Sequence, residues 1–159
     1  MKKFLFILCV IAAVSCGKDD PINPEYVLFR KLSKGKGIWE VKKIEQYTYD
    51  AQGNETLTST ATPEQQYIFY VKSEYVNGLI ISYNAVTVAD KGLGGITYGI
   101  YAEKERVIFH PVGDNLNANF VFNVLENKRN SQLWSTNVSD STKTLIYLDK
   151  CNSCDPYYP

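Results

Sequence analysis

The residues best able to do chemistry in this 159-residue chain are two cysteines and a single histidine. Cys151 and Cys154 stand in a C-x-x-C arrangement, a spacing that suits a disulfide, a redox pair or one half of a zinc site. A redox pair needs its first cysteine at a helix N-terminus, and Pro156 and Pro159 disfavour a helix here. A zinc site needs four ligands, and His110 would supply only a third. A disulfide that pins the tail is the interpretation we adopt, and a redox pair and a metal site are the alternatives.

No catalytic motif accompanies these residues. His110 has no serine or cysteine placed as a nucleophile, and the patterns G-x-S-x-G, H-E-x-x-H and G-x-x-x-x-G-K-[ST] are absent. Lys and Arg number 17, and so do Asp and Glu, so the chain lacks the positive charge typical of nucleic-acid binders. The sequence therefore predicts a protein that is not an enzyme, holds no metal or cofactor and binds no nucleic acid.

The first 16 residues are typical of an export signal. Two lysines precede an apolar run of 11 residues, Phe4 to Val14, whereas a membrane-spanning helix needs about 20. The run leads through Ala-Val-Ser to Cys16 and resembles a bacterial lipobox, in which the cysteine is lipidated and the signal is cut just before it. We therefore expect residues 1–15 to be a lipoprotein signal peptide and residues 16–24 to contain the lipidated cysteine and a tether.

The residues after the expected cleavage also point to the cell envelope. The sequence GKDD at 17–20 resembles the Lys-plus-acidic run behind the lipid cysteine of Bacteroidota-type surface lipoproteins. This resemblance implies a lipid anchor at Cys16 in the outer membrane, in the periplasmic or the surface-exposed leaflet. Loss of the two signal lysines leaves 15 basic against 17 acidic residues, a balance that provides no second, electrostatic attachment to the membrane.

Residues 25–159 predict one domain that is almost entirely β. Apolar residues spaced three apart predict a short helix that begins at Pro24 and ends by Gly35 or Gly37. From Gly37 onward, the hydrophobic period changes to two, and turn sequences separate eight or nine segments. The predicted strands cover 38–49, 55–60, 66–72, 79–88, 95–102, 105–110, 119–126, 131–138 and 143–149.

Short links between successive strands predict an antiparallel meander, because a parallel crossover needs a dozen or more residues. About eight such strands close most economically as an up-and-down barrel, and a β-sandwich is the alternative. The pattern of the first strand slips between Val41 and Ile44, which predicts a bulge near Lys42 and Lys43. Alternation predicts an inner face that includes Tyr67, Phe69, Val71, Ile96, Tyr98, Ile100, Val107, Phe109, Phe120, Phe122 and Val124. The opposite face is the alternative, because it is also apolar at Ile68, Tyr70, Val121 and Leu125.

A short helix followed by Gly37-Ile38-Trp39 opens the first strand of this meander. The arrangement resembles the lipocalin (calycin) superfamily and, more narrowly, the lipocalin-like domains of Bacteroidota lipoproteins. The resemblance implies that Trp39 packs across the closed barrel end and that Gly37 lets the backbone run close beneath it. It also implies a basic residue over the tryptophan, for which Arg129 and Lys150 are candidates.

Two functions fit this barrel. One is a binding module that holds a small apolar or amphipathic ligand in the barrel mouth, against residues that include Tyr67, Phe69, Tyr98 and Phe122. The other is a barrel filled by its own side chains, which presents loops to an envelope protein or a protease. Aromatic side chains at the surface would serve either function, and Trp134, Tyr157 and Tyr158 are the candidates.

Overall fold

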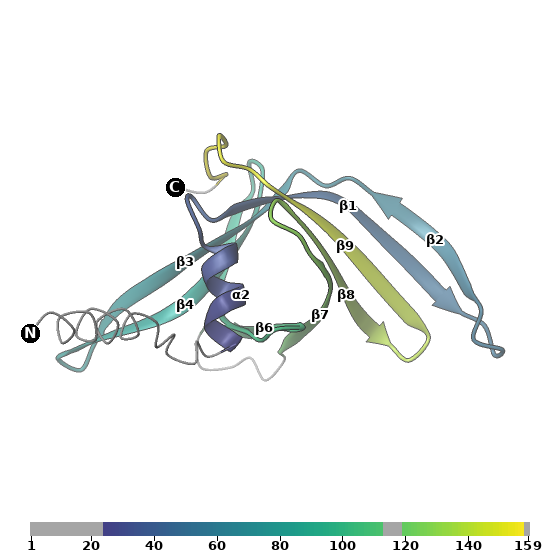
Figure 1. Ribbon diagram of the computed structural model, residues 1–159, viewed down its shortest axis with the longest axis horizontal. Coiled ribbons are helices and arrows are strands. Elements are labelled where there is room, and N and C mark those ends of the chain that lie inside the picture. Colours follow the sequence, from purple (N-terminus) through teal and green to yellow (C-terminus); the bar gives the residue numbers. More distant parts are fainter. Residues whose placement is uncertain (1–23, 113–118, 158–159) are drawn as a thin grey trace, which may run out of the picture.

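The computed structural model describes residues 24–112 and 119–157, which form a closed antiparallel barrel of eight strands with one additional strand and a short helix (Figure 1). The predicted all-β fold, an up-and-down lipocalin-like barrel, is therefore confirmed, and the sandwich alternative does not apply. The helix is α2 (Pro24–Leu32). The strands are β1 (Ile38–Tyr49), β2 (Glu55–Ala61), β3 (Gln65–Val76), β4 (Leu79–Asp90), β5 (Gly94–Ala102), β6 (Arg106–Pro111), β7 (Phe120–Asn127), β8 (Ser131–Ser139) and β9 (Thr142–Lys150).

Strand β1 closes the barrel because it pairs with both ends of the meander. Strands β3 to β9 each pair with the next strand in sequence. Strand β1 pairs with β3 through Ile38, Trp39 and Glu40, and with β9 along most of its length. Strand β2 lies outside the closed barrel, where it pairs with the second half of β1 from Ile44 to Tyr49. The neighbour of β1 on this edge therefore changes from β3 to β2.

The long first strand contains the predicted bulge. Its register with β9 shifts between Val41 and Lys43, so Lys42 is the extra residue. A bulge bends a strand and increases its twist. This bend lets one strand both close the barrel and continue beyond it.

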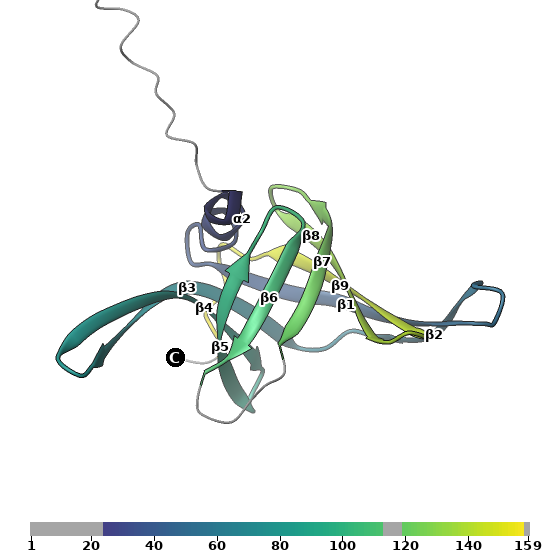
Figure 2. The ribbon, with the colours of Figure 1, turned by 90° about the horizontal axis from the view of Figure 1, so that it is seen from below.

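Helix α2 covers one end of the barrel (Figure 2). Leu28, Phe29 and Leu32 are buried and join the barrel core. A helix of nine residues is marginal alone, so the burial of this face is what stabilises it. The helix ends at Leu32, earlier than the predicted limit, and Ser33 donates hydrogen bonds from both its amide and its hydroxyl to the Phe29 carbonyl.

The alternation predicted for the inner face is confirmed in the middle of the strands, but the prediction is wrong for three residues near strand ends or beyond the barrel. Val71, Ile96 and Phe120 are 60%, 64% and 48% exposed. Val71 lies beyond the last β1–β3 pair, and the other two lie close to strand ends. Six residues of the predicted inner face are buried: Tyr67, Phe69, Ile100, Val107, Phe109 and Phe122.

Trp134 was predicted to be exposed, and this prediction is wrong. The side chain is completely buried in the barrel core, where it contacts four other aromatic rings. Tyr157, the other exposed candidate that the structure describes, is partly buried against the barrel.

Two β projections leave the barrel on opposite sides (Figure 1). The first is residues 71–84, the distal part of the β3–β4 hairpin, which we call the ribbon. The second, which we call the arm, consists of β2 and the parts of β1 and β9 that run beside it. Every residue of β2 is exposed.

The predicted signal peptide 1–15, Cys16 and Tyr158 lie outside the described residues. Helix α2 begins at Pro24, as the spacing of apolar residues predicts, so this last residue of the range 16–24 belongs to the helix. Within residues 24–112 and 119–157, no helix has the length and hydrophobicity needed to cross a bilayer.

Candidate functional site

The four residues proposed to line a ligand site belong to the aromatic packing inside the barrel. Tyr67, Phe69 and Phe122 are buried, and their ring centroids lie 6.0, 6.1 and 5.7 Å from that of Trp134. Tyr98 is partly buried and stacks on Phe109 at 5.8 Å. The barrel brings all four residues together, but around two aromatic side chains that the sequence analysis did not assign to the site.

Contacts between aromatic rings fill the interior of the barrel. The rings of Phe109 and Phe122 are 4.9 Å apart, and edge-to-face contacts join Phe109 to Tyr67 and to Trp134. Aromatic pairs in such geometries add about 0.5–1.5 kcal/mol each beyond the burial of their area. Burial also raises the pKa of the Tyr67 phenol, so this side chain stays neutral at physiological pH.

Gly37 and Trp39 stand at the barrel end that α2 covers. Gly37 has a φ of +66°, and a Cβ added there would lie 2.1 Å from the Phe69 carbonyl oxygen. The Phe69 amide donates a hydrogen bond of 2.9 Å to the Gly37 carbonyl, so the close approach is part of strand pairing. A side chain at this position would meet both backbone strain and a backbone clash.

Trp39 is completely buried and is held by polar contacts on two sides. Its indole Nε1 donates a hydrogen bond of 2.8 Å to the Leu32 carbonyl at the end of α2. Lys150 Nζ lies 5.4 Å from the ring centroid, so of the two basic candidates Lys150 is the one that covers the tryptophan. A cation over an indole face is attracted by the quadrupole of the ring.

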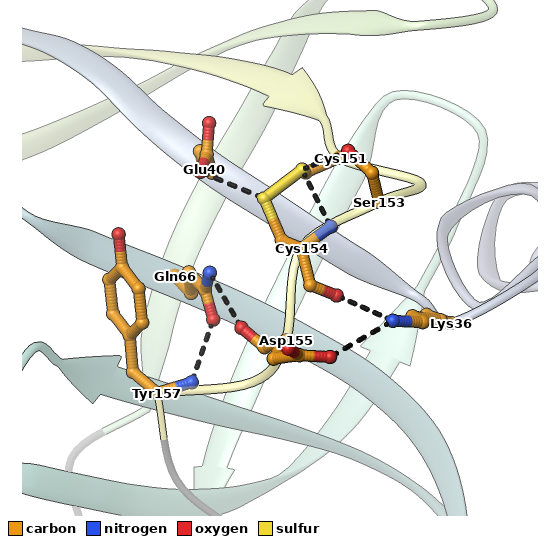
Figure 3. Close-up of polar contacts among 8 residues, drawn as sticks. All are labelled: Lys36, Glu40, Gln66, Cys151, Ser153, Cys154, Asp155 and Tyr157. Atoms are coloured by element: carbon orange, nitrogen blue, oxygen red, sulfur yellow. Dashed lines mark hydrogen bonds and ion pairs between the residues drawn. A yellow bond between two sulfur atoms is a disulfide. The ribbon is translucent and has the colours of Figure 1, made fainter.

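Cys151 and Cys154 form a disulfide directly after β9 (Figure 3). The Cys154 amide donates a hydrogen bond to Cys151 Sγ, and Glu40 Oε1 on β1 lies 3.0 Å from Cys154 Sγ. Lys36 donates hydrogen bonds to the Cys154 carbonyl and to Asp155. These contacts hold the C-terminal segment against the start of β1.

Gln66 extends this attachment to β3 (Figure 3). Its side-chain nitrogen donates to the Asp155 carbonyl at 3.3 Å, and its oxygen accepts a hydrogen bond from the Tyr157 amide at 3.0 Å. Gln66 is itself fully buried. The tail therefore satisfies a buried polar side chain that would otherwise cost free energy.

The metal and redox alternatives at this motif depend on free thiols. Donor atoms of Glu40, Cys151 and Cys154 lie within 4.8 Å of one another. Zinc binds cysteine as thiolate, so the disulfide form offers no such ligands. His110 does not belong to this group of donors, and its Nδ1 lies 2.9 Å from Asn119 Oδ1.

The ribbon has an apolar tip that the sequence analysis did not single out. Its turn is Asn77-Gly78 with positive φ at both residues, which matches the right-handed twist of a two-residue hairpin. Nearer the barrel, the ribbon is polar: Ser73 and Ser82 are hydrogen-bonded, and Lys72 pairs with Glu74. Six large apolar side chains of the ribbon are 40–77% exposed: Val71, Tyr75, Val76, Leu79, Ile80 and Ile81.

Comparison with models of protein families, with curated proteins and with solved structures gives no significant match for this chain. The assignment of function therefore rests on the fold and the surface described above.

Proposed function

We propose that this protein is a non-enzymatic, lipid-anchored module of the bacterial cell envelope that presents its ribbon to a protein partner. The observation that carries the proposal is the exposed apolar tip of the β3–β4 hairpin. The barrel acts as a rigid support, because aromatic side chains pack across its interior.

The tip of the ribbon is apolar on both of its faces. Register pairs Tyr75 with Ile80 and Val76 with Leu79, and successive pairs of a hairpin point to opposite faces. Burial of an apolar surface is worth about 25 cal/mol per Å². Contiguous exposed apolar surface of this kind marks interaction sites in soluble domains.

The backbone of the ribbon favours a protein over a lipid bilayer as the partner. Among the described residues, no strand pairs with the outer edge of β3 beyond Phe69 or of β4 before Ala85. Unpaired amide and carbonyl groups cost several kcal/mol each in hydrocarbon, which disfavours insertion of such a ribbon. A partner that adds an extended strand would satisfy these groups and cover the apolar side chains at the same time.

The anchor would keep the start of helix α2 close to the membrane. Pro24 follows Cys16 by eight positions, so the chain between them spans at most about 28 Å when fully extended. Replacement Cys16→Ala should release the protein from isolated membranes into the soluble fraction. If the variant still sediments with membranes, the lipid anchor is excluded.

Photocrosslinking in intact cells tests the partner. A photoreactive residue placed at Ile80, which is 75% exposed, should give one discrete protein adduct that maps to a single partner segment. The same residue placed at Leu57 on β2, which is 50% exposed, is the control and should give none. The adduct should vanish when Tyr75→Ser and Leu79→Ser are combined. Adducts to lipid alone, or equal adducts from both positions, would contradict the proposal.

A second candidate function, a small amphipathic ligand in the barrel mouth, is favoured by one aromatic pair. Tyr98 and Phe120 meet edge to face at 5.8 Å, and Phe120 is 48% exposed, so apolar ring surface remains open. Native mass spectrometry of the purified protein after exposure to a lipid and glycan extract tests this alternative. A stoichiometric small-molecule adduct that Phe120→Ser abolishes supports it, and a clean apo mass excludes it.

A further inference from the structure

A cavity of about 790 Å³ opens at the barrel end that α2 covers. Its walls come from the C-terminal end of α2, the β7–β8 turn and the chain at the end of β9. No lining residue is a carboxylate, and five are cationic: Arg30, Lys31, Lys34, Arg129 and Lys150. The fold thus gathers positive charges that are widely separated in the sequence.

Among the described residues, almost all cations outside this cavity form ion pairs with carboxylates. Of the 17 Lys and Arg residues, all except Lys2, Lys3 and Lys18 are described by the structure. Eight of the described cations form ion pairs with described carboxylates. Of those that remain, five line this cavity, and Lys104 on the β5–β6 turn is the sixth. Unpaired positive charge in the described part of the chain is therefore concentrated at one place.

Two of the five side chains are held in position by neutral groups. Lys31 Nζ donates to the backbone carbonyl of Asn127 at 2.7 Å and to its side-chain oxygen at 2.5 Å. Lys150 Nζ lies over the Trp39 ring and donates to the Lys31 carbonyl at 3.4 Å. Burial, followed by the charges of Lys34, Arg129 and Lys31, lowers the pKa of Lys150. The ammonium group thus experiences a positive local field that no described carboxylate offsets.

Helix stability alone does not explain this cluster. Cations in the last turn of a helix interact favourably with its dipole, and Arg30 and Lys31 occupy that turn. Arg129 and Lys150, however, belong to other elements, and their approach to α2 brings like charges together. Such an arrangement is relieved when an anion occupies the space between them.

We propose that this cavity binds a phosphate-containing anion that carries more than one negative charge. Arginine presents paired N–H donors that match phosphate oxygens, and lysine ammonium groups add mobile point charges. Ser33, Asn130 and Asn152 provide further hydrogen-bonding groups in the wall. The same chemistry occurs in soluble diphosphates and in the headgroups of anionic lipids, and the experiment below distinguishes these sources.

The test is isothermal titration calorimetry of the purified protein in a neutral detergent, with inorganic pyrophosphate in one arm and dihexanoyl phosphatidic acid in the other. The cavity variant combines Lys34→Gln with Arg129→Gln, because both side chains are exposed and their loss should leave the fold intact. The matched control combines Lys91→Gln with Lys104→Gln, which removes the same charge from exposed positions outside the cavity.

We expect the cavity variant to lose at least tenfold in affinity and the control to lose less than twofold. Tighter binding of the short-chain lipid would identify a lipid headgroup as the ligand, and equal or tighter binding of pyrophosphate would identify a soluble anion. Binding that falls equally in both variants, or no binding in either arm, would overturn the proposal. Because neither the ribbon nor Cys16 is altered, this outcome is independent of the proposed function.

Discussion

The ribbon and the arm are both β projections from the same barrel, yet their surfaces differ in kind. In the arm, Glu45 accepts hydrogen bonds from Tyr47 and Tyr147 and forms an ion pair with Lys43. Glu55 at the start of β2 pairs with Lys143. The tip of the ribbon instead exposes tyrosine, valine, leucine and isoleucine side chains.

The difference shows what each projection is suited to do. Polar networks such as that around Glu45 give the arm a hydrophilic surface that needs no partner. A two-stranded hairpin has only marginal stability alone in water, and the apolar side chains at the tip of the ribbon stay exposed. They therefore add little to the stability of the hairpin. The barrel thus supplies stability to both projections, and only the ribbon carries a surface that a partner would cover.

The largest effect on stability should come from a substitution in the barrel, from which both projections extend. We expect Trp39→Ala to lower the free energy of unfolding by about 3–5 kcal/mol, since it removes a fully buried aromatic ring. Urea denaturation followed by circular dichroism measures the change. A loss below about 1 kcal/mol would mean that the barrel end does not depend on this side chain.

Two glycine substitutions compare the closed end of the barrel with the tip of the arm. Gly37→Ala should lower the free energy of unfolding by about 1–3 kcal/mol or more, because positive φ and contact with the Phe69 backbone act together. Gly53→Ala at the arm's turn also has positive φ, but an added Cβ meets nothing within 4 Å, so its cost should be smaller. Thermal unfolding of both variants measures the difference, and equal costs would argue against the backbone clash.

Loss of the disulfide should have a moderate effect. Replacing Cys151 and Cys154 by serine should cost about 2 kcal/mol or less, because a bridge between residues three apart closes only a small loop. Limited proteolysis should then release the tail beyond β9 while the barrel stays intact. Global unfolding of the double variant would show that the tail is part of the barrel's stability.

Alkaline pH should weaken the arm more than the ribbon. Burial, with help from the hydrogen bond to Glu45, raises the pKa of Tyr147 to about 12. The folded state therefore keeps a proton that the unfolded chain loses near pH 10, so stability falls as pH rises from about 10 to about 12. Ultraviolet absorbance should show late tyrosinate formation, to which Tyr67 also contributes, and Tyr147→Phe should reduce its amplitude by one tyrosine. An amplitude unaffected by this change would contradict the assignment.

The smallest effect on stability should come from the ribbon tip. Leu79→Ser together with Ile80→Ser should change the free energy of unfolding by about 0.5 kcal/mol or less, because both side chains are largely exposed. Chemical denaturation measures it, with Leu57→Ser in the arm as the control. A loss of several kcal/mol would mean that the tip packs against the protein itself.

Local patterns made the barrel predictable. Strand alternation, turn residues and the slip after Val41 are short-range signals, and the described residues form nine strands near the predicted ranges, with the bulge at Lys42. Strand ends were less predictable, because the alternation of β3 continues from Phe69 to Val71 without a break. The point at which β3 leaves the barrel depends on its three-residue pairing with β1, which is a long-range contact.

The candidate surfaces depended even more on long-range contacts. Trp134 is buried because rings from β3 and β6 surround it, and the sequence of its own strand gives no sign of these contacts. The cationic cavity brings together residues as far apart in the sequence as Arg30 and Lys150. The overall charge of the chain is balanced, so composition gave no indication of this local cluster. The apolar residues after Asn77-Gly78 were interpreted as ordinary barrel strand, and Tyr75 and Val76 before the turn were left outside the predicted strand, which ended at residue 72.

The division of roles between barrel and ribbon is tested most directly by hydrogen–deuterium exchange, measured on the purified protein and on the same protein in isolated cell envelopes. In the purified protein, amides of the ribbon should exchange much faster than those of β8 and β9. In envelopes, residues 71–84 should become protected while β2 in the arm stays unchanged. Equally fast exchange of the ribbon in both samples would contradict the account.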